Sequence, residues 1–338
     1  MSLARYAAFR IAVIVPVIVL MLTLTFLITH VLPANPAVEA AGPYPTHAMI
    51  VEKEHQLGLD HPVLVQLGNY FGDLLHGNLG HSFVTGDSIT KDLLDRVPST
   101  LELITLGLLL GTALAVGVAV WSADKERGPA AIVARLYGGF GSSVPDFFLG
   151  VMLILIFYAV LNIAPAPLGQ SSPRSAPVPN WSGAYLIDAI HAGNLSAVGS
   201  ALAHLVLPVV TLALAYSAPI YRVARAAIED ARRARYVDYL VLMGASRRLI
   251  WRSVLENAAP PALTIIGVLY GLMLGGAVIV ETVFSWGGVG QYAVSSINNN
   301  DFFAIQGFVL VAGIFSVVIY LAVDLLHAAL DPRVRRSA

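Results

Sequence analysis

The sequence predicts an all-α integral membrane protein in which six transmembrane helices form a bundle, and three observations lead to this prediction. Of the 338 residues, 57% are apolar and only 12% are charged, about half the charged share with which a soluble domain covers its surface. Six apolar stretches are long enough to cross a bilayer. Lys and Arg residues are concentrated in alternate segments between these stretches.

Each of the six stretches has about 20 residues or more, the length that crosses ~30 Å of hydrocarbon at about 1.5 Å per residue. They cover residues 11–32, 101–121, 136–163, 201–221, 258–280 and 302–326. Backbone polar groups in lipid must be paired within the protein, and these runs lack the two-residue alternation of barrel strands. All six are therefore predicted to be helices.

The distribution of basic residues indicates the orientation of the spans. Four segments hold sixteen of the 20 Lys and Arg residues, namely 1–10, 122–135, 222–257 and 327–338. The other segments, 33–100, 164–200 and 281–301, hold four. Positively charged loops tend to stay on the cytoplasmic side. Both termini and the 222–257 loop are therefore predicted to be cytoplasmic, and the other three segments extracytoplasmic.

The basic 222–257 loop is predicted to contain two helices joined by a bend. Val237, Leu240 and Val241 are spaced i, i+3 and i+4, which gives a helix an apolar face. Gly244 then favours a left-handed helix stop, and Ala245-Ser246 favours the start of a second short helix. These residues alone leave two interpretations open: a hook that projects from the membrane, or an amphipathic helix held among lipid headgroups by its Arg residues.

The loop also carries a motif, Tyr236-Val237-Asp238-Tyr239-Leu240-x-x-x-Gly244, followed by Leu255-x-Asn257 and Pro261. It resembles the ATPase-coupling loop of permease subunits of ABC importers, usually written E-A-A-x-x-x-G. Asp238 and Gly244 match that pattern, whereas Tyr239 and Leu240 replace its two alanines. Other motifs are G-N-L-G-x-S at 77–82, T-L-E-L at 100–103, S-x-P-x-F-x-x-G at 143–150, E-T-V-F-S-W-x-G-x-G at 281–290 and D-P-R at 331–333. Together they are similar to dipeptide and oligopeptide importer permeases, a group that includes nickel and glutathione permeases.

This resemblance, which is strongest to the dipeptide permeases, implies a type I ABC importer permease that forms half of a translocation pore in a bacterial or archaeal cytoplasmic membrane. A second homologous permease, two cytoplasmic ATPases and an extracytoplasmic peptide-binding protein are the implied partners, and nucleic acid is not among them. The sequence contains no G-x-x-x-x-G-K-[ST] motif. The chain is therefore expected to have no catalytic residues or cofactor of its own, with ATP and Mg²⁺ bound by the partner ATPases. The residues expected to couple to them are Val237, Asp238, Leu240, Val241, Gly244 and Ala245.

Charged groups inside a span are costly, so each is a functional candidate. Asp146 follows Pro145 within the third apolar stretch. Its carboxylate either faces the translocation path, where it meets the ammonium group of a peptide, or caps the helix that Pro145 starts. Glu281 and Asp324 lie at span edges and are expected to be structural.

Glycines in the fifth apolar stretch favour close helix packing. Gly267, Gly271 and Gly275 are spaced i, i+4 and i+8 and share one helix face; Gly107 and Gly111 form a similar pair in the second stretch. Small residues at this spacing let helix backbones approach closely. A tight interface in the pore-forming core is predicted, the alternative being glycines that face lipid.

The 281–301 loop is expected to face the binding protein through Trp286, Gly288, Asn298 and Asn299, as the equivalent loop of type I importers does. Five histidines lie in 33–100, namely His47, His55, His61, His76 and His81. Imidazole suits nickel or zinc, but their spacing gives no H-x-x-x-H pair, so no metal site is expected. A nickel or glutathione permease remains an alternative. An ion-coupled secondary transporter is the alternative of another class, with Asp146 beside Pro145 in its favour.

Overall fold

The computed structural model describes residues 3–31, 36–42, 44–124, 127–172, 175 and 177–330. Within these ranges all the regular elements are helical, and a single isolated β-bridge joins His81 to Ser88. The expected all-α architecture is confirmed. Residues 331–338, which contain the D-P-R motif and most of the predicted cytoplasmic C-terminus, lie outside the described residues.

Four of the described helices are long and apolar enough to cross a membrane. They are α5 (Ile89–Ser122), α9 (Leu195–Arg232), α11 (Arg247–Val283) and α13 (Phe302–Leu330). Two shorter apolar helical stretches lie in α1 (Leu3–Val31) and in α7 (Asp146–Leu153) with the π-helix η1 (Ile154–Val160). Many large apolar side chains on these elements are exposed, among them Leu20, Leu109 and Leu272, as expected for surfaces that face lipid.

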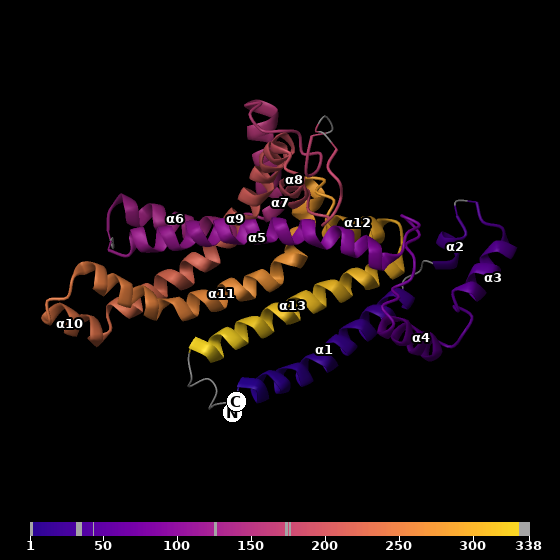
Figure 1. Ribbon diagram of the computed structural model, residues 1–338, viewed down its shortest axis with the longest axis horizontal. Coiled ribbons are helices and arrows are strands. Elements are labelled where there is room, and N and C mark those ends of the chain that lie inside the picture. Colours follow the sequence, from indigo (N-terminus) through magenta and orange to yellow (C-terminus); the bar gives the residue numbers. More distant parts are fainter. Residues whose placement is uncertain are drawn as a thin grey trace.

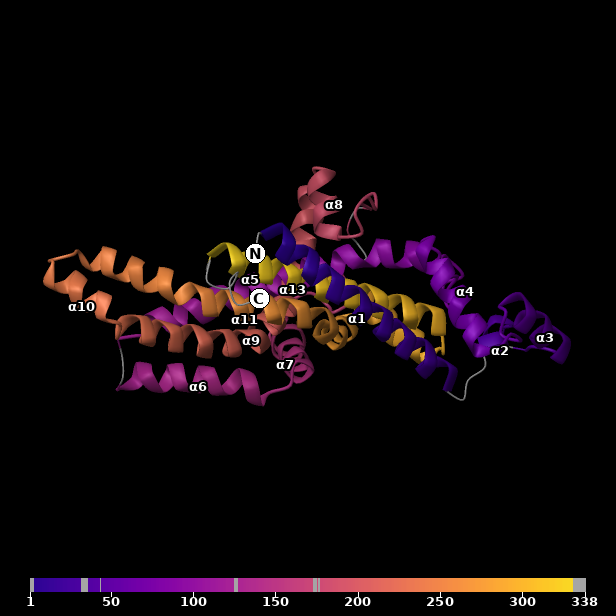
Figure 2. The same ribbon diagram turned by 90° about the horizontal axis from the view of Figure 1, so that it is seen from below.

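The long helices lie side by side in an elongated molecule (Figures 1 and 2). α5 packs on α9, α9 on α11, α11 on α13 and α13 on α1. Helix α10 (Arg235–Leu242) stands at one end of the molecule, and α2 (Pro36–Ala40), α3 (His47–Gln56) and α4 (Val63–Leu75) stand at the other. Along this axis, α1 begins and α13 ends toward the side of α10 (Figure 1).

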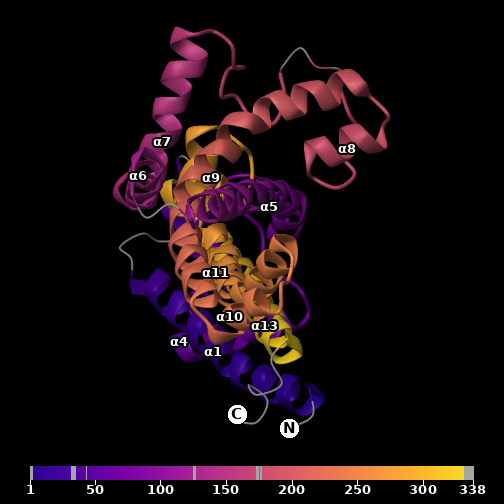
Figure 3. The same ribbon diagram turned by 90° about the vertical axis from the view of Figure 1, so that its left-hand side faces the viewer.

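The apolar stretch 136–163 is not the single helix that was predicted. Helix α6 (Pro129–Ser143) ends before Val144, which is extended at φ −112° and ψ 122°, and α7 starts after Pro145. Proline has no N–H to donate, and it disfavours helical geometry in the residue before it. As a result, α6 and α7 point in different directions (Figure 3).

Helix α9 changes direction along its length. It contains Pro208 and Pro219, and each proline removes a backbone hydrogen bond of the helix. The first part of α9 lies with α7 and α8 (Tyr185–His191), whereas the rest packs along α5 and α11 (Figures 1 and 3). The main core forms where α5, α9 and α11 meet, around Leu103, Leu212 and Met273.

The predicted glycine row forms close contacts at two of its three positions. A Cβ atom at Gly267 would overlap the Val323 side chain, and one at Gly271 would lie 3.0 Å from Cε1 of Tyr320. Both neighbours belong to α13, so the row forms an interface between α11 and α13. A Cβ atom at Gly275 would meet nothing within 4 Å, and the predicted contact at that position is wrong.

The second predicted glycine pair also lies in a tight interface. A Cβ atom at Gly107 would lie 2.8 Å from Cβ of Leu212, and one at Gly111 would lie 3.0 Å from the carbonyl oxygen of Ala213. These two glycines therefore let α5 approach the backbone of α9 closely, as small residues do between membrane helices.

Candidate functional site

A bent segment at one end of the molecule carries the predicted coupling motif, and we call residues 233–246 the hook. α10 ends at Leu242, Gly244 has φ +69°, and the N–H of Ala245 donates to the carbonyl of Leu240 over 3.0 Å. Ser246 then caps α11 by accepting a hydrogen bond from the N–H of Leu249. The predicted helix, glycine stop and restart are all present.

The lengths of the flanking helices differ from the prediction. The second helix was expected to be short, but α11 continues for 37 residues through Pro260 and Pro261. On the other side, α9 extends to Arg232. The predicted 222–257 loop therefore consists of α10 between the ends of two membrane-length helices, because the polar ends of those helices stay helical beyond the apolar run.

Charged residues tie the base of the hook to α5. Asp124, just after α5, forms ion pairs with Arg232 at the end of α9 and, over 3.5 Å, with Arg247 at the start of α11. Arg232 also donates to the carbonyl of Ala123, and its guanidinium lies 5.4 Å from the centre of the Trp251 ring. Surface ion pairs are individually weak, but this network connects the end of α5 to the two helices that flank the hook.

The tip of the hook presents an apolar surface that differs from the predicted face. Val237 packs against the main core and Leu240 is half-buried, whereas Val241 is exposed. Leu242 is 85% exposed and Met243 is 68% exposed. Sequence analysis missed these two residues because the i, i+3, i+4 pattern ignores the apolar residues that immediately precede the glycine stop.

Polar groups flank this apolar tip. Asp238 and Tyr239 are exposed on α10. Arg235 at the start of α10 and Arg248 at the start of α11 are exposed as well. Neighbouring exposed apolar side chains rimmed by polar residues are typical of protein interaction sites, so the tip is suited to contact another protein.

At the opposite end of α11 a buried carboxylate joins three helices, and we call Thr100, Glu281 and Gln291 the latch. Glu281 is fully buried. The Thr100 hydroxyl donates to Oε1 of Glu281 over 2.5 Å, and the N–H of Gln291 donates to Oε2 over 3.0 Å. The N–H of Val289 in turn donates to the Thr100 oxygen over 2.9 Å. The latch thus connects α5, α11 and α12 (Val289–Asn298).

Trp286 and Gly288, predicted to face the binding protein, are buried in the fold instead. Trp286 is 2% exposed, and its ring nitrogen donates to the carbonyl of Ser99 over 3.1 Å. A Cβ atom at Gly288 would overlap the Thr100 hydroxyl. These residues hold the segment between α11 and α12 against α5, so the prediction that they form an exposed surface is wrong.

The two asparagines of the same prediction are differently placed. Asn298 and Asn299 are both exposed at the end of α12. The side-chain amide of Asn299 donates to the carbonyl of Ser295 over 2.7 Å, within the same turn. Their amide groups therefore remain accessible for contacts with another molecule.

The Asp301 carboxylate connects the start of α13 to residues 82 and 83. Oδ2 of Asp301 accepts hydrogen bonds from the Ser82 hydroxyl over 2.6 Å and from the N–H of Phe83 over 2.8 Å. Nearby, the Arg96 guanidinium lies 5.0 Å from the centre of the Tyr292 ring, and burial raises the pKa of Tyr292. The Tyr292 hydroxyl is consequently neutral at physiological pH. The hydrogen bonds of Asp301 hold the residues before α5 against the start of α13.

Asp146 and Pro145 lie at the break between α6 and α7. Pro145 is exposed, and Asp146 is half-buried in the first turn of α7. Oδ1 of Asp146 accepts a hydrogen bond from the N–H of Phe147 over 2.9 Å. This local contact satisfies one of the free N–H groups at a helix start.

The five histidines of the 33–100 segment do not come together in one cluster. Among the described residues, no three His, Asp or Glu side chains are grouped closely enough to hold a metal ion. Nδ1 of His76 donates to the carbonyl oxygen of Gly72 over 2.8 Å, and His55 lies 3.7 Å from a carboxylate oxygen of Asp60. Both contacts are local to the segment between α1 and α5.

Comparison with known proteins places the chain in a family. The family described as "Binding-protein-dependent transport system inner membrane component" matches residues 100–336, and the N-terminal family of such membrane components matches residues 3–104. The dipeptide transport system permease protein DppB of Alkalihalophilus pseudofirmus is 33% identical, with 98% of this chain and 99% of that protein covered.

Two further relatives are named after different substrates. The probable D,D-dipeptide transport system permease protein DdpB of Escherichia coli is 38% identical, over 93% of this chain and 92% of that protein. The glutathione transport system permease protein GsiC of Salmonella choleraesuis is 30% identical, over 98% of this chain and 99% of that protein.

Proposed function

The chain belongs to the family of binding-protein-dependent transport system inner membrane components, and we propose that it is the permease subunit of an ATP-driven importer of dipeptides. It is a multi-pass integral membrane protein of a bacterial cell membrane, and the permease subunit is not itself the catalytic part of such a system. The near-full-length similarity to permease proteins of dipeptide transport systems carries this proposal.

In the proposed topology, α1, α5, the broken pair of α6 and α7 with η1, α9, α11 and α13 provide six spans, and both termini are cytoplasmic. The distribution of Lys and Arg supports this orientation, as does the position of the hook toward the side where α1 begins and α13 ends (Figure 1). The native chain has no Cys, so single cysteines test it. We expect an impermeant maleimide to label Leu64→Cys on intact cells and Leu242→Cys only after permeabilisation; the reverse pattern would refute the orientation.

The hook is proposed to dock on one of two cytoplasmic ATPase subunits, which bind ATP and Mg²⁺. The apolar tip enters a groove of the ATPase, Asp238 lies at its rim, and Gly244 with Ala245 sets the bend. Because α9 and α11 both lead from the hook into the membrane, movement of the ATPase is transmitted directly to two spans. A second homologous permease completes the pore.

The opposite end of the molecule is proposed to receive peptide from an extracytoplasmic binding protein, with Asn298 and Asn299 as contact residues. Pro145 and Asp146 are proposed to lie beside the translocation path, because the helix break leaves polar groups at a depth where an unbroken helix would have none. Replacement of Asp146 by Asn is expected to lower the transport rate without loss of assembly. An unchanged rate would remove Asp146 from the path.

Glutathione is a second candidate substrate, because one relative of nearly the same length is named as a glutathione permease. Glutathione and dipeptides share an amino-terminal ammonium group and a peptide bond. The two candidates therefore differ in the size and charge that the importer must accept, and an assay with both ligands separates them.

The proposed function is tested by ATP hydrolysis. The chain is assembled with the neighbouring permease and ATPases in lipid nanodiscs and titrated with binding protein loaded with dipeptides, longer peptides, glutathione or nickel. We expect the greatest stimulation with dipeptide-loaded binding protein. If another ligand class gives the greatest stimulation, that class is the substrate instead. Failure to assemble with any ATPase would refute the importer assignment.

A further inference from the structure

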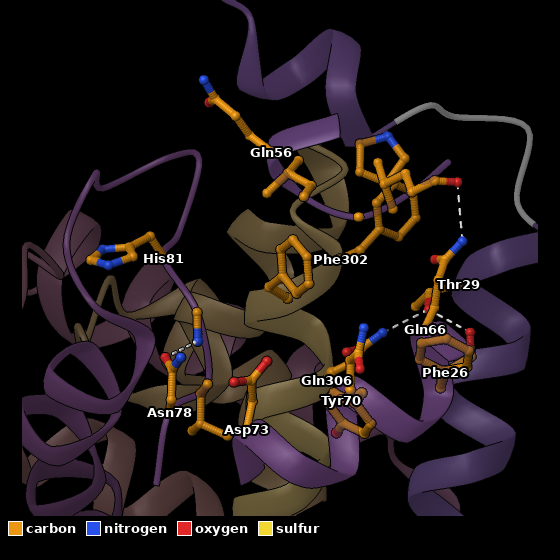
Figure 4. A pocket seen from close by; sticks show the side chains of 18 of the residues that line it. Phe26, Thr29, Gln56, Gln66, Tyr70, Asp73, Asn78, His81, Phe302 and Gln306 are labelled. Atoms are coloured by element: carbon orange, nitrogen blue, oxygen red, sulfur yellow. Dashed lines mark hydrogen bonds between the residues drawn. The ribbon is translucent and has the colours of Figure 1, made fainter. Parts of the chain in front are cut away.

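A cavity of about 740 Å³ lies between the end of α1, helices α3 and α4, residues 78–83 and the start of α13 (Figure 4). Its volume is within the range of about 300–1,000 Å³ that is typical of small-molecule sites. It is separate from the hook and from the latch. The segment between α1 and α5 forms most of its wall, so this segment does more than connect two helices.

Gln306 provides an unused hydrogen-bond acceptor at this cavity. The side chain is only 3% exposed, and its amide nitrogen donates to the Thr29 hydroxyl over 2.9 Å. The Thr29 hydroxyl donates its own hydrogen bond to the carbonyl of Phe26, so it can only act as an acceptor toward Gln306. This arrangement fixes the orientation of the amide and leaves Oε1 of Gln306 without a partner. A buried acceptor without a donor is costly, and a ligand that brings a donor removes that cost.

The charges around the cavity favour a cation. The lining residues include two carboxylates, Glu54 and Asp73, and none of them is Lys or Arg. Asp73 is exposed and forms no ion pair within the described part of the chain. A phosphate group in this cavity would have no cationic partner among the lining residues, with His81 as the only group that could become positive. The lining is therefore suited to an ammonium group and unsuited to a phosphorylated headgroup.

Aromatic rings form the apolar part of the wall. Phe26 and Tyr70 stack with ring centres 5.7 Å apart, and Phe302 and Phe303 contribute from α13. Burial raises the pKa of Tyr70 to about 12, so its hydroxyl is neutral and adds no negative charge. Ring faces attract a nearby cation and also provide contact area for an apolar side chain.

We propose that this cavity binds the amino-terminal residue of a peptide, with Asp73 and Oε1 of Gln306 accepting hydrogen bonds from its ammonium group and the aromatic wall contacting its side chain. The proposal rests on the proposed function and makes it more specific, because it places a peptide-binding site on the permease itself. A peptide released from the binding protein is then held at the edge of the membrane domain before translocation.

The test uses the assembled transporter in phosphatidylcholine nanodiscs without binding protein, and radiolabelled L-phenylalanyl-L-alanine as the probe. We expect saturable binding that Asp73→Asn weakens about tenfold, since the variant keeps the shape of the side chain but loses the charge-assisted hydrogen bond. Gln306→Leu is expected to weaken binding as well. Asp60→Asn changes an exposed carboxylate of the same segment that does not line the cavity, and it is expected to leave the affinity unchanged.

Competition experiments identify the group that is recognised. N-acetyl-L-phenylalanyl-L-alanine, which lacks the ammonium group, is expected to compete at least tenfold more weakly than the free peptide. Equal competition, unchanged affinity of Asp73→Asn, or no saturable binding would overturn the proposal. Loss of peptide binding in nanodiscs that contain phosphatidylethanolamine would also overturn it, in favour of a lipid headgroup.

Failure of this inference can be told apart from failure of the proposed function. The same preparations are assayed for ATP hydrolysis stimulated by dipeptide-loaded binding protein. Stimulation without peptide binding to the cavity refutes the cavity site alone, whereas absence of stimulation by any dipeptide refutes the dipeptide importer.

Discussion

Gly267 and Gly271 allow α13 to lie directly against α11, because the space that a side chain would need is occupied by Val323 and Tyr320. The Ser316 hydroxyl donates to the carbonyl of Gly271 over 3.0 Å, which adds a polar contact to the same interface. Gly275 lies on the same helix face but contacts nothing comparable. The same substitution at these three glycines therefore tests the contact with α13, because the positions share one helix face and differ in what surrounds them.

Replacement of Gly267 by Ala is expected to destabilise the protein. The added methyl group overlaps a stiff β-branched side chain, and overpacking of this kind costs about 1–3 kcal/mol. Thermal unfolding in nanodiscs, followed by tryptophan fluorescence, measures the effect as a lower Tm. Gly275→Ala is the control and is expected to leave the Tm unchanged or higher, since Ala favours helix over Gly. Equal losses in both variants would contradict the assigned interface.

Thr100 performs two tasks in the latch, since its hydroxyl donates to Glu281 and accepts from the N–H of Val289. Thr100→Val removes both bonds and leaves buried groups unsatisfied, at a cost of at least about 1–3 kcal/mol. Thr282→Val is the matched control, because Thr282 is exposed and its hydroxyl bonds the Val278 carbonyl of its own helix. Chemical unfolding should give a clearly lower free energy of unfolding for Thr100→Val than for Thr282→Val. Similar values for the two variants would mean that the latch contributes little to stability.

At the scale of elements, the hook depends on one backbone conformation. Gly244 has φ +69°, and nothing lies within 4 Å of a Cβ built there. A substitution at this position therefore acts through backbone strain and not through a clash. Left-handed geometry costs an ordinary side chain about 1–2 kcal/mol, whereas Asn tolerates it better. The bend can thus be changed without altering the surface of the tip.

Gly244→Val is expected to uncouple the transporter. A strain of about 1–2 kcal/mol depletes the native turn by a factor of about 5–30, so stimulation of ATP hydrolysis by the loaded binding protein should fall strongly. Gly244→Asn should retain most of the stimulation. If both variants behave like the native protein, the bend is not required for coupling.

The elements differ in how well the sequence predicts them. Apolar runs located every membrane-length helix, and the glycine stop located the bend of the hook. The division at Pro145 was missed because the apolar run continues across it, although the proline itself disfavours a helical Val144. The joining of the second hook helix to the fifth span was also missed, because the loop was expected to end at residue 257, whereas α11 runs without interruption from Arg247 to Val283.

At the scale of the whole molecule, contacts between distant residues decide what is exposed. Trp286 is buried because it bonds Ser99, which is 187 residues away in the sequence. The cavity of Figure 4 likewise combines residues from α1, α4 and α13. No local pattern indicates such pairings, so the sequence predicted the bent helix pair of the hook but not the buried state of Trp286 and Gly288.

Along the long axis, the two ends of the molecule differ in the features that they present. The hook lies at one end, whereas α3 and α4, which help to line the cavity, lie at the other (Figure 1). Helices α9, α11 and α13 connect them through continuous packing. This separation is what an importer needs if ATP is hydrolysed on one side of the membrane and peptide is received on the other.

Cross-linking from the tip of the hook tests this account most directly. Because the native chain has no Cys, Leu242→Cys provides a unique thiol on a side chain that is 85% exposed, and Leu64→Cys provides a control of 82% exposure at the other end. In the assembled transporter, a short thiol cross-linker should join Leu242→Cys to an ATPase subunit and leave Leu64→Cys free of it. An ATPase-active complex with no adduct at Leu242→Cys, or with an ATPase adduct at Leu64→Cys, would contradict the account.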